Sequence, residues 1–172
     1  DELPVPLLGE TRKGHTYVLT KEQWQSGLIV RLLSGREKAF ACDLAWRMFL
    51  KYEAPDYSQE GIDEFRRTLD NQEYVGRMRF YGAFQHDKLI GMLAMRRPQH
   101  ICLFFVDEEY QGTGIGRKLF NRMRQDYIEQ EFTVNSSPYA VEIYKRLGFS
   151  PTDAEQTVNG IRFTPMKYKG DI

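Results

Sequence analysis

The sequence has little cysteine, no net charge and no long hydrophobic run. Two cysteines in 172 residues make neither a disulfide framework nor a metal cluster, so we expect no metal site. The 24 basic and 24 acidic residues balance, which gives no indication of nucleic acid or an anionic membrane as the main partner. No segment approaches the roughly 20 apolar residues of a membrane-spanning helix, and the N-terminus has no basic-then-apolar signal pattern. These features predict a cytoplasmic protein.

The length and composition predict one folded domain with a proper core, over residues 27–172. Cys42 and Cys102 lie in apolar contexts, which predicts reduced, buried thiols. Residues 1–26 are interpreted as an N-terminal arm, for which two interpretations stay open. Thr16–Thr20 could form a strand with Trp24 as its anchor, or the arm could be a flexible or tag-derived segment.

The periodicity of the remaining chain alternates between strands and helices. Apolar runs predict strands at 28–33, 79–84, 88–96, 101–106 and 132–135. The polar turn Gln85-His86-Asp87 predicts a hairpin between the second and third of these strands, and a second hairpin is predicted over 157–168. Helical spacing predicts helices at 37–52, from Ser58 through Leu69, from 115 to about 130, and at 138–147. Asn159-Gly160 is a strong signal for the last hairpin, and Ser137-Pro138 and Gly148 are expected to bound the last helix. Together these elements indicate an α+β protein with a mixed sheet.

The segment Phe104–Lys118 carries the clearest functional signal. It leads from an apolar strand through an acidic turn to Gly112, Gly114 and Gly116 and then into a helix. Glycines at such a junction let a ligand approach backbone N–H groups at the positive end of the helix dipole. The segment therefore predicts an anion site, most plausibly for a phosphate or diphosphate.

Three phosphate-loop patterns compete for this segment. The P-loop needs Gly-Lys-Ser/Thr, whereas Gly116 is followed by Arg117, Lys118 and Leu119. The dinucleotide fingerprint needs G-x-G-x-x-G in an opening βαβ unit, which the spacing and late position do not match. The remaining pattern, Gln/Arg-x-x-Gly-x-Gly/Ala, is filled by Gln111, Gly114 and Gly116. The alternative is a glycine-rich turn that only tightens a connection.

A second motif follows on the next strand and helix. Asn135 and Ala140 fill N-x-x-x-x-A, and Tyr144 precedes Gly148-Phe149 at the helix end. With the glycine loop, in this order and between these elements, the motif resembles the GNAT N-acetyltransferase superfamily over roughly 28–168. The resemblance implies the acyl-CoA N-acyltransferase fold, a central twisted mixed sheet with helices on both faces.

The resemblance also implies acetyl-CoA as the acyl donor, held as diphosphate by backbone N–H groups of the glycine loop. The implied cofactor-binding residues are Phe104, Phe105, Val106, Gln111, Gly112, Thr113, Gly114, Ile115, Gly116, Arg117, Asn135, Ala140 and Tyr144. In the family, the strand residues lie along the pantetheine arm, and an N–H near Val106 polarises the thioester carbonyl.

Tyr144 is the implied catalytic acid. By analogy with the family, its phenol would protonate the departing sulfur, because its ordinary pKa of about 10 lies near that of a thiol. The alternative is that Tyr144 only packs, on a helix face shared with Ala140 and Leu147.

Glu53 is the candidate base or acceptor contact. With Asp56, Tyr52 and Tyr57 it gives an acidic, aromatic loop, which in the family borders the acceptor site and would suit a cationic amine. The alternative is a solvated loop.

The implied function is transfer of the acetyl group of acetyl-CoA to a primary amine of a small molecule or protein, by direct attack. Two alternatives stay open, a non-catalytic acyl-CoA-binding module and an enzyme that uses another acyl-CoA. The sequence is compatible with either a monomer or a homodimer.

Overall fold

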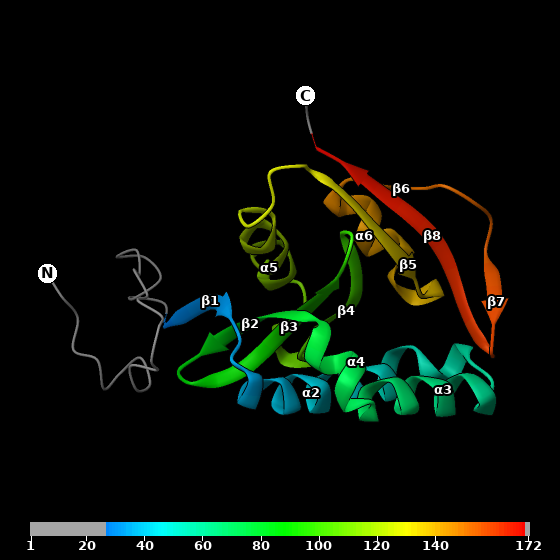
Figure 1. Cartoon of the computed structure of the whole chain (residues 1–172), viewed down its shortest axis with the longest axis horizontal. Helices are drawn as coiled ribbons and strands as arrows, with labels where there is room; N and C mark the ends of the chain where they lie inside the picture. Colours follow the sequence, from blue (N-terminus) through cyan, green and yellow to red (C-terminus); the bar gives the residue numbers. More distant parts are fainter. Residues whose placement is uncertain (1–26, 171–172) are drawn as a thin grey trace, which may run out of the picture.

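The computed structural model describes residues 27–170, so the expectations for 1–26 lie outside the described residues. Residues 27–170 form an eight-stranded sheet in the order β1-β2-β3-β4-β5-β8-β6, with β7 paired to β8. Among these described strands, all pairs are antiparallel except β4 and β5, which are parallel. Helices lie on both faces (Figure 1), as the sequence predicts.

The strands are β1 (Leu28–Leu32), β2 (Arg79–Gln85), β3 (Lys88–Arg96), β4 (His100–Val106), β5 (Glu131–Ser136), β6 (Phe149–Pro151), β7 (Gln156–Val158) and β8 (Ile161–Lys169). The α-helices are α2 (Lys38–Tyr52), α3 (Gln59–Asp70), α4 (Gln72–Arg77), α5 (Ile115–Arg124) and α6 (Val141–Leu147). Short 3-10 helices are η2 (Gly35–Glu37), η3 (Ala54–Asp56), η4 (Glu108–Tyr110) and η5 (Pro138–Ala140).

The two hairpins expected from the sequence are present. The β2–β3 hairpin turns through His86 and Asp87, both with positive φ. The β7–β8 hairpin turns through Asn159 and Gly160, with φ of 52° and 77°. Positive φ at both central residues suits the right-handed twist of the flanking strands, which is why this dipeptide predicts the hairpin.

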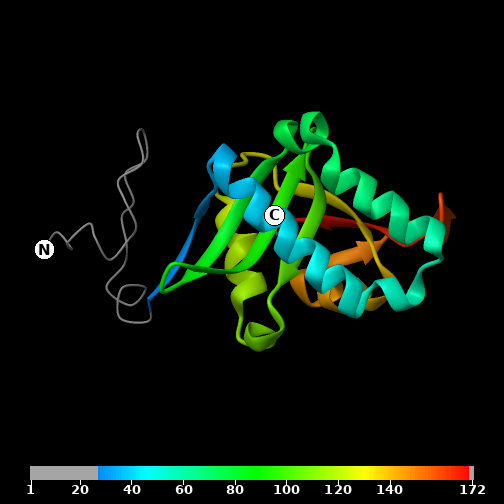
Figure 2. The same cartoon turned by 90° about the horizontal axis from the view of Figure 1, so that it is seen from below.

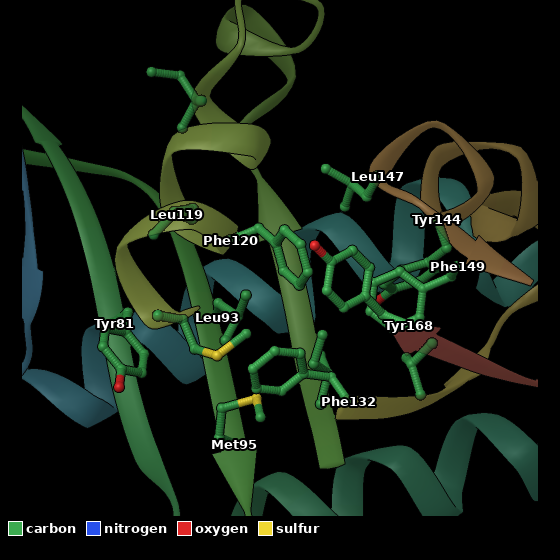
Figure 3. Close-up of a cluster of buried hydrophobic side chains, with 14 of the residues drawn as sticks. Tyr81, Leu93, Met95, Leu119, Phe120, Phe132, Tyr144, Leu147, Phe149 and Tyr168 are labelled. Carbon is green, nitrogen blue, oxygen red and sulfur yellow. The ribbon is translucent and has the colours of Figure 1, made fainter. Parts of the chain in front are cut away.

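Two apolar cores lie on opposite faces of the sheet. Helix α2 packs on β3 and β4, because Ala41, Leu44, Ala45 and Met48 fall on one buried side of it. The core on the other face includes residues of α5, β5, α6 and β8, and Figure 3 shows its aromatic rings. Figure 2, seen from below, shows α2 and α3 lying across the strands.

The one parallel pair of strands is short. Strands β4 and β5 pair only at His100↔Thr133 and Ile101↔Val134, although both continue beyond this point. Strand β5 pairs with β8 along its full length, so it stays in the sheet while it separates from β4. Among the strands described, none therefore pairs with the end of β4 on this side, and two cavities lie here.

Several expectations need correction. Helix α5 ends at Arg124 instead of near residue 130, because Asp126 and Tyr127 donate their backbone N–H groups three residues back and tighten the last turn. Helix α4 and strand β6 are not predicted from the sequence. Cys42 and Cys102 are free thiols but are partly exposed, not buried, because each lies at the margin of the core on the α2 face.

Candidate active site

The glycine loop connects β4 to α5. Gly112 and Gly114 have φ of 76° and 87°, a conformation that side chains with a Cβ rarely adopt. A Cβ built at either position would meet no atom within 4 Å, so both face open space. Gly114 is the N-cap of α5, and the backbone N–H groups of the first turn have no helical partners. This end of α5 suits an anion.

Side-chain hydrogen bonds hold the loop in place. The amide of Gln111 donates to the carbonyl of Val106 at 3.0 Å, and the hydroxyl of Thr113 donates to the carbonyl of Tyr110. The guanidinium of Arg117, in the first turn of α5, donates to the carbonyl of Arg146 at 2.8 Å, which ties the start of α5 to the end of α6. Such anchoring reduces the ordering needed when a ligand binds.

A cavity of about 630 Å³, here called the loop cavity, runs from the glycine loop to Tyr144. It is lined by Met48, Tyr52, Glu53, Phe104, Phe105, Val106, Tyr110, Gln111, Gly112, Gly114, Ile115, Gly116, Arg117, Tyr139, Ala140, Glu142, Ile143, Tyr144, Arg146 and Leu147. Of the residues expected to bind the cofactor, all line it except Thr113 and Asn135. Their roles in binding stay predictions.

A second cavity, of about 260 Å³ and here called the strand cavity, follows β4 beneath α3 and α4. Asn135 lies on this cavity instead of the first. The two cavities share the lining residues Glu53, Phe104, Phe105, Ala140 and Tyr144. The shared residues therefore mark the place where a ligand in one cavity could react with a ligand in the other.

Glu53 is held at this junction by the fold. It caps the C-terminus of α2, its backbone N–H donating to the carbonyl of Phe49, and its carboxylate accepts a hydrogen bond from the hydroxyl of Ser137 at 3.0 Å. Burial raises the pKa of Glu53 to about 7, while the bond from Ser137 opposes this rise and the charge of Asp56 adds to it. A carboxyl with a pKa near neutrality can both take up and release a proton in the physiological range.

The sequence left two interpretations of Tyr144 open, packing in the core and acid catalysis. The position of Tyr144 is compatible with both, because the residue belongs to the core and also lines the cavities. Its ring packs edge-to-face against Phe104 and Phe149, with centroids 6.0 and 5.3 Å apart, and Figure 3 shows it beside Phe149 and Tyr168. The same side chain lines both cavities. Burial, and then the charge of Glu53, raises the pKa of Tyr144 well above its usual value. The phenol therefore stays protonated and can act as a hydrogen-bond donor.

The backbone of β4 also faces the junction. Asp107 donates its N–H to the carbonyl of Ile90 on β3 at 2.8 Å. Because N–H groups alternate in direction along an antiparallel strand, the N–H of Val106 points away from β3. It points toward the side on which β4 has separated from β5.

The acidic, aromatic loop expected at the acceptor site is divided between the cavities. Tyr52 lines the loop cavity and stacks on Tyr139, with centroids 5.2 Å apart, whereas Tyr57 lines the strand cavity. Asp56 is exposed and lines neither cavity. Glu53 alone of the four lines both.

Sequence reasoning missed several residues of the site. Ser137 was expected only to cap a helix, but its hydroxyl reaches Glu53, 84 positions earlier in the chain. Arg96, His100 and Cys102 line the strand cavity, although no motif includes them. None of these contacts leaves a local signal, because each depends on how α2, β3, β4 and β5 meet in the fold.

The chemistry of the loop cavity fits a coenzyme A molecule. Exposed amides at the start of α5 suit a diphosphate, and the apolar strand residues Phe104–Val106 suit an uncharged arm. Within residues 27–170, no three His, Cys, Asp or Glu side chains gather closely enough to hold a metal ion. None of the helices described there has both the length and the apolar character needed to cross a membrane.

The fold is that of solved acetyltransferase structures. A GCN5-related N-acetyltransferase from Rhodopseudomonas palustris superposes with a TM-score of 0.71 at 19% identity, covering 91% of this chain and 99% of that chain. The PaiA N-acetyltransferase from Thermoplasma acidophilum, solved with coenzyme A, gives 0.65 at 21% identity, covering 83% and 99%. An aminoglycoside 6'-N-acetyltransferase, also solved with coenzyme A, gives 0.55 at 12% identity, covering 81% and 95%. At these identities the likeness shows the fold.

The assignment of this chain to a family rests on its sequence. Residues 53–169 match the family model described as the acetyltransferase (GNAT) domain. The chain therefore belongs to the GNAT acetyltransferase family, as the two motifs predicted. A search of curated proteins found no match.

Proposed function

We propose that this protein is an acetyl-CoA-dependent N-acetyltransferase that transfers the acetyl group to a primary amine by direct attack. The observation that carries the proposal is the meeting of the two cavities at Glu53 and Tyr144. Relatives in the fold, the PaiA and aminoglycoside acetyltransferases, have been solved with coenzyme A, which supports coenzyme A as the ligand of the loop cavity. The amine would enter from the strand cavity.

The backbone and side chains would share the binding of acetyl-CoA. Amides from Gln111 to Gly116 would hold the diphosphate at the start of α5. Phe104, Phe105 and Ala140 would line the pantetheine arm and bring the thioester to the junction. The N–H of Val106 would donate to the thioester oxygen, where negative charge develops as the amine attacks.

Proton transfers would fall to the two titratable side chains of the junction. An ammonium ion must lose a proton before its nitrogen can attack, and Glu53 would accept it, directly or through a water. The new C–N bond forms as the C–S bond breaks, and the phenol of Tyr144 would protonate the departing sulfur. The proton that the acetylated nitrogen then loses would restore the phenol of Tyr144. Glu53 is ionised above a pH of about 7, so the rate should rise with pH through this value.

A coenzyme A release assay tests the proposal. The purified protein would be incubated with acetyl-CoA and a panel of polyamines, aminoglycosides, amino acids and peptides, with binding of coenzyme A measured in parallel by calorimetry. Turnover with at least one amine is expected. Tight binding of coenzyme A without turnover on any amine would instead indicate a non-catalytic binding module, and turnover only with a longer acyl-CoA would correct the donor.

A further inference from the structure

A strongly basic cavity lies beside the strand cavity. It has a volume of about 990 Å³ and is here called the basic cavity. Its charged lining residues are Lys38, Arg77, Arg79, Arg96 and Arg97, and no aspartate or glutamate within residues 27–170 lines it. In a chain with equal numbers of acidic and basic residues, five cations around one cavity give a local positive potential that attracts anions.

Three of these cations are not neutralised by a carboxylate. Arg77 pairs with Glu73, and the ammonium of Lys38 donates to backbone carbonyls of α4 and the chain after it. In the part of the chain that the structure describes, no carboxylate lies within 4 Å of the guanidinium groups of Arg79, Arg96 and Arg97. These three groups can therefore bind an anion without first breaking an ion pair.

The basic cavity meets the strand cavity at Arg96. Met78 and Arg96 line both, and Arg96 lies close enough to Tyr74 and Cys102 in the strand cavity to oppose the rise of their pKa values. Glu53 lies at the other end of the strand cavity, where it meets the loop cavity. The strand cavity thus has an acid at the end near the reaction and an arginine at the far end.

The length of the strand cavity follows from β4. Arg96 pairs with His100 at the start of this strand, while Phe104 lies at the junction with the loop cavity. Four residues of extended strand span about 13 Å. The rings of Tyr57, Phe65 and Tyr74 line the cavity, and such side chains pack well against an apolar chain.

We propose that the acceptor is an elongated primary amine with an anionic group, a phosphate or a carboxylate, at its far end. Its amine lies at Glu53, its middle lies against the aromatic rings, and its anion is bound by Arg96, with Arg79 and Arg97 adding positive potential. This inference rests on the proposed function and narrows its substrate class. A planar guanidinium binds either anion through two parallel hydrogen bonds.

The neighbouring groups support this assignment of charge. His100 also lines the strand cavity, but burial lowers its pKa to about 4, and its Nδ1 lies 2.8 Å from the hydroxyl of Thr133. It is therefore neutral at physiological pH. Arg96 is the only permanent cation among the described residues that line the strand cavity.

Matched amines of equal length test the proposal. The kcat/KM of acetylation would be compared for aminohexyl phosphate, aminoheptanoate, aminohexanol and diaminohexane with acetyl-CoA at saturation. We expect phosphate or carboxylate to exceed the alcohol about tenfold or more, since a hydrogen bond between two charged groups is stronger than one to a neutral hydroxyl, and diaminohexane to be the poorest substrate. The phosphate and carboxylate arms identify which anion the site prefers. Equal values for all four amines would overturn the inference.

Variants separate binding of the anion from a general structural effect. Arg96→Gln should bring the ratio of phosphate to alcohol down to about one, and Arg96→Lys should restore part of it. Arg67→Gln, which removes an exposed arginine paired with Glu64, is the control and should keep the wild-type ratio. A ratio that survives Arg96→Gln, or that also falls in Arg67→Gln, would contradict the inference.

Failure of the proposed function and failure of the inference about the anion give different results in these assays. If coenzyme A binds and no amine of any charge is acetylated, the protein is not an acetyltransferase of amines, and the inference fails with it. If aminohexanol is acetylated as fast as aminohexyl phosphate, the proposed function stands and only the inference about the anion is wrong.

Discussion

The two cavities that meet at Tyr144 are built in different ways. The loop cavity takes most of its lining from the continuous segment between Phe104 and Arg117 and from α6 and the turn before it, and its proposed anion site consists of backbone N–H groups. The strand cavity is assembled from side chains of α3, α4, β3, β4, β5, η5, α6 and β8 and of the residues on either side of η3. A backbone site needs only glycines and a helix start, which a short motif can specify. A side-chain site needs the whole tertiary fold.

This difference separates what the family shares from what sets one member apart. Any acyl-CoA presents the same diphosphate, so the same loop can serve many members of the family. Acceptors differ, and the side chains of the strand cavity can change without disturbing the loop.

Removal of the Tyr144 hydroxyl should give the largest effect on rate. We expect Tyr144→Phe to lower kcat about 100-fold or more, which is within the range for loss of a general acid, with the Kd of coenzyme A nearly unchanged because the ring and its packing remain. Tyr168→Phe is the matched control, since this core tyrosine lines neither cavity. If Tyr144→Phe kept full activity while the chemical step limits the rate, Tyr144 would not be the general acid.

The pH profile tests Glu53 as the base. Its pKa of about 7 means that the ionised, proton-accepting form increases with pH, so kcat/KM should rise through pH 7. Glu53→Gln should lower kcat about 100-fold at pH 8 and abolish this rise, whereas the exposed control Glu131→Gln should preserve both. If kcat/KM of Glu53→Gln still rose through pH 7, the group that titrates would not be Glu53.

The same substitution should stabilise the folded protein. Glu53 has a higher pKa in the folded chain than its ordinary 4.5, so its contribution to stability is complete below about pH 4.5 and is lost as pH rises through about 7. Glu53→Gln does not titrate and should raise the free energy of unfolding by about 1–3 kcal/mol at pH 8, with no gain at pH 4. Denaturant unfolding at both pH values measures this. An equal effect at both values would mean that ionisation is not its cause.

A side chain at Gly114 should weaken the anion site. Gly114→Val forces a β-branched residue into φ of 87°, which should distort the start of α5 and raise the Kd of coenzyme A about tenfold. Gly35→Ala is the control, because Gly35 also has open space around it but no positive φ. Calorimetry measures the Kd of coenzyme A for both variants. Unchanged affinity in Gly114→Val would place the diphosphate elsewhere.

The smallest effect is expected at Ser137. Its hydroxyl stabilises the ionised form of Glu53 through the 3.0 Å hydrogen bond. Ser137→Ala should therefore shift the rise in the pH profile to higher pH and lower the rate at neutral pH a few-fold. The control Ser150→Ala removes an exposed hydroxyl on β6. A shift to lower pH would contradict the assigned hydrogen bond.

Much of the fold could be predicted from local signals in the sequence. Asn159-Gly160 predicts the β7–β8 hairpin. Gly148, with φ of 106°, ends α6 as expected for a residue in the left-handed conformation. The end of α5 could not be predicted, because its last turn is tightened by bonds that no periodicity encodes. Strand β6 has only three residues and exists through its pairing with β8.

The parts of the site that belong to short local motifs could be predicted from the sequence, whereas the side chains placed by tertiary contacts could not. The glycine loop and Tyr144 belong to motifs of fixed spacing, and the structure brings them to one cavity. Glu53 was predicted as a rim residue, but its burial and its bond to Ser137 depend on the contact of α2 with the segment after β5. Arg96 reaches the strand cavity because β3 and β4 pair at His100, a tertiary fact without a sequence signature.

A crystal structure with bound coenzyme A tests the central claim most directly. We predict that the diphosphate lies against the amides of Gln111–Gly116 and that the sulfur lies within about 3.5 Å of the Tyr144 hydroxyl, as a hydrogen bond to sulfur allows. The sulfur should face Glu53 across the junction of the two cavities. Coenzyme A bound outside the loop cavity, or a sulfur far from Tyr144, would contradict the account.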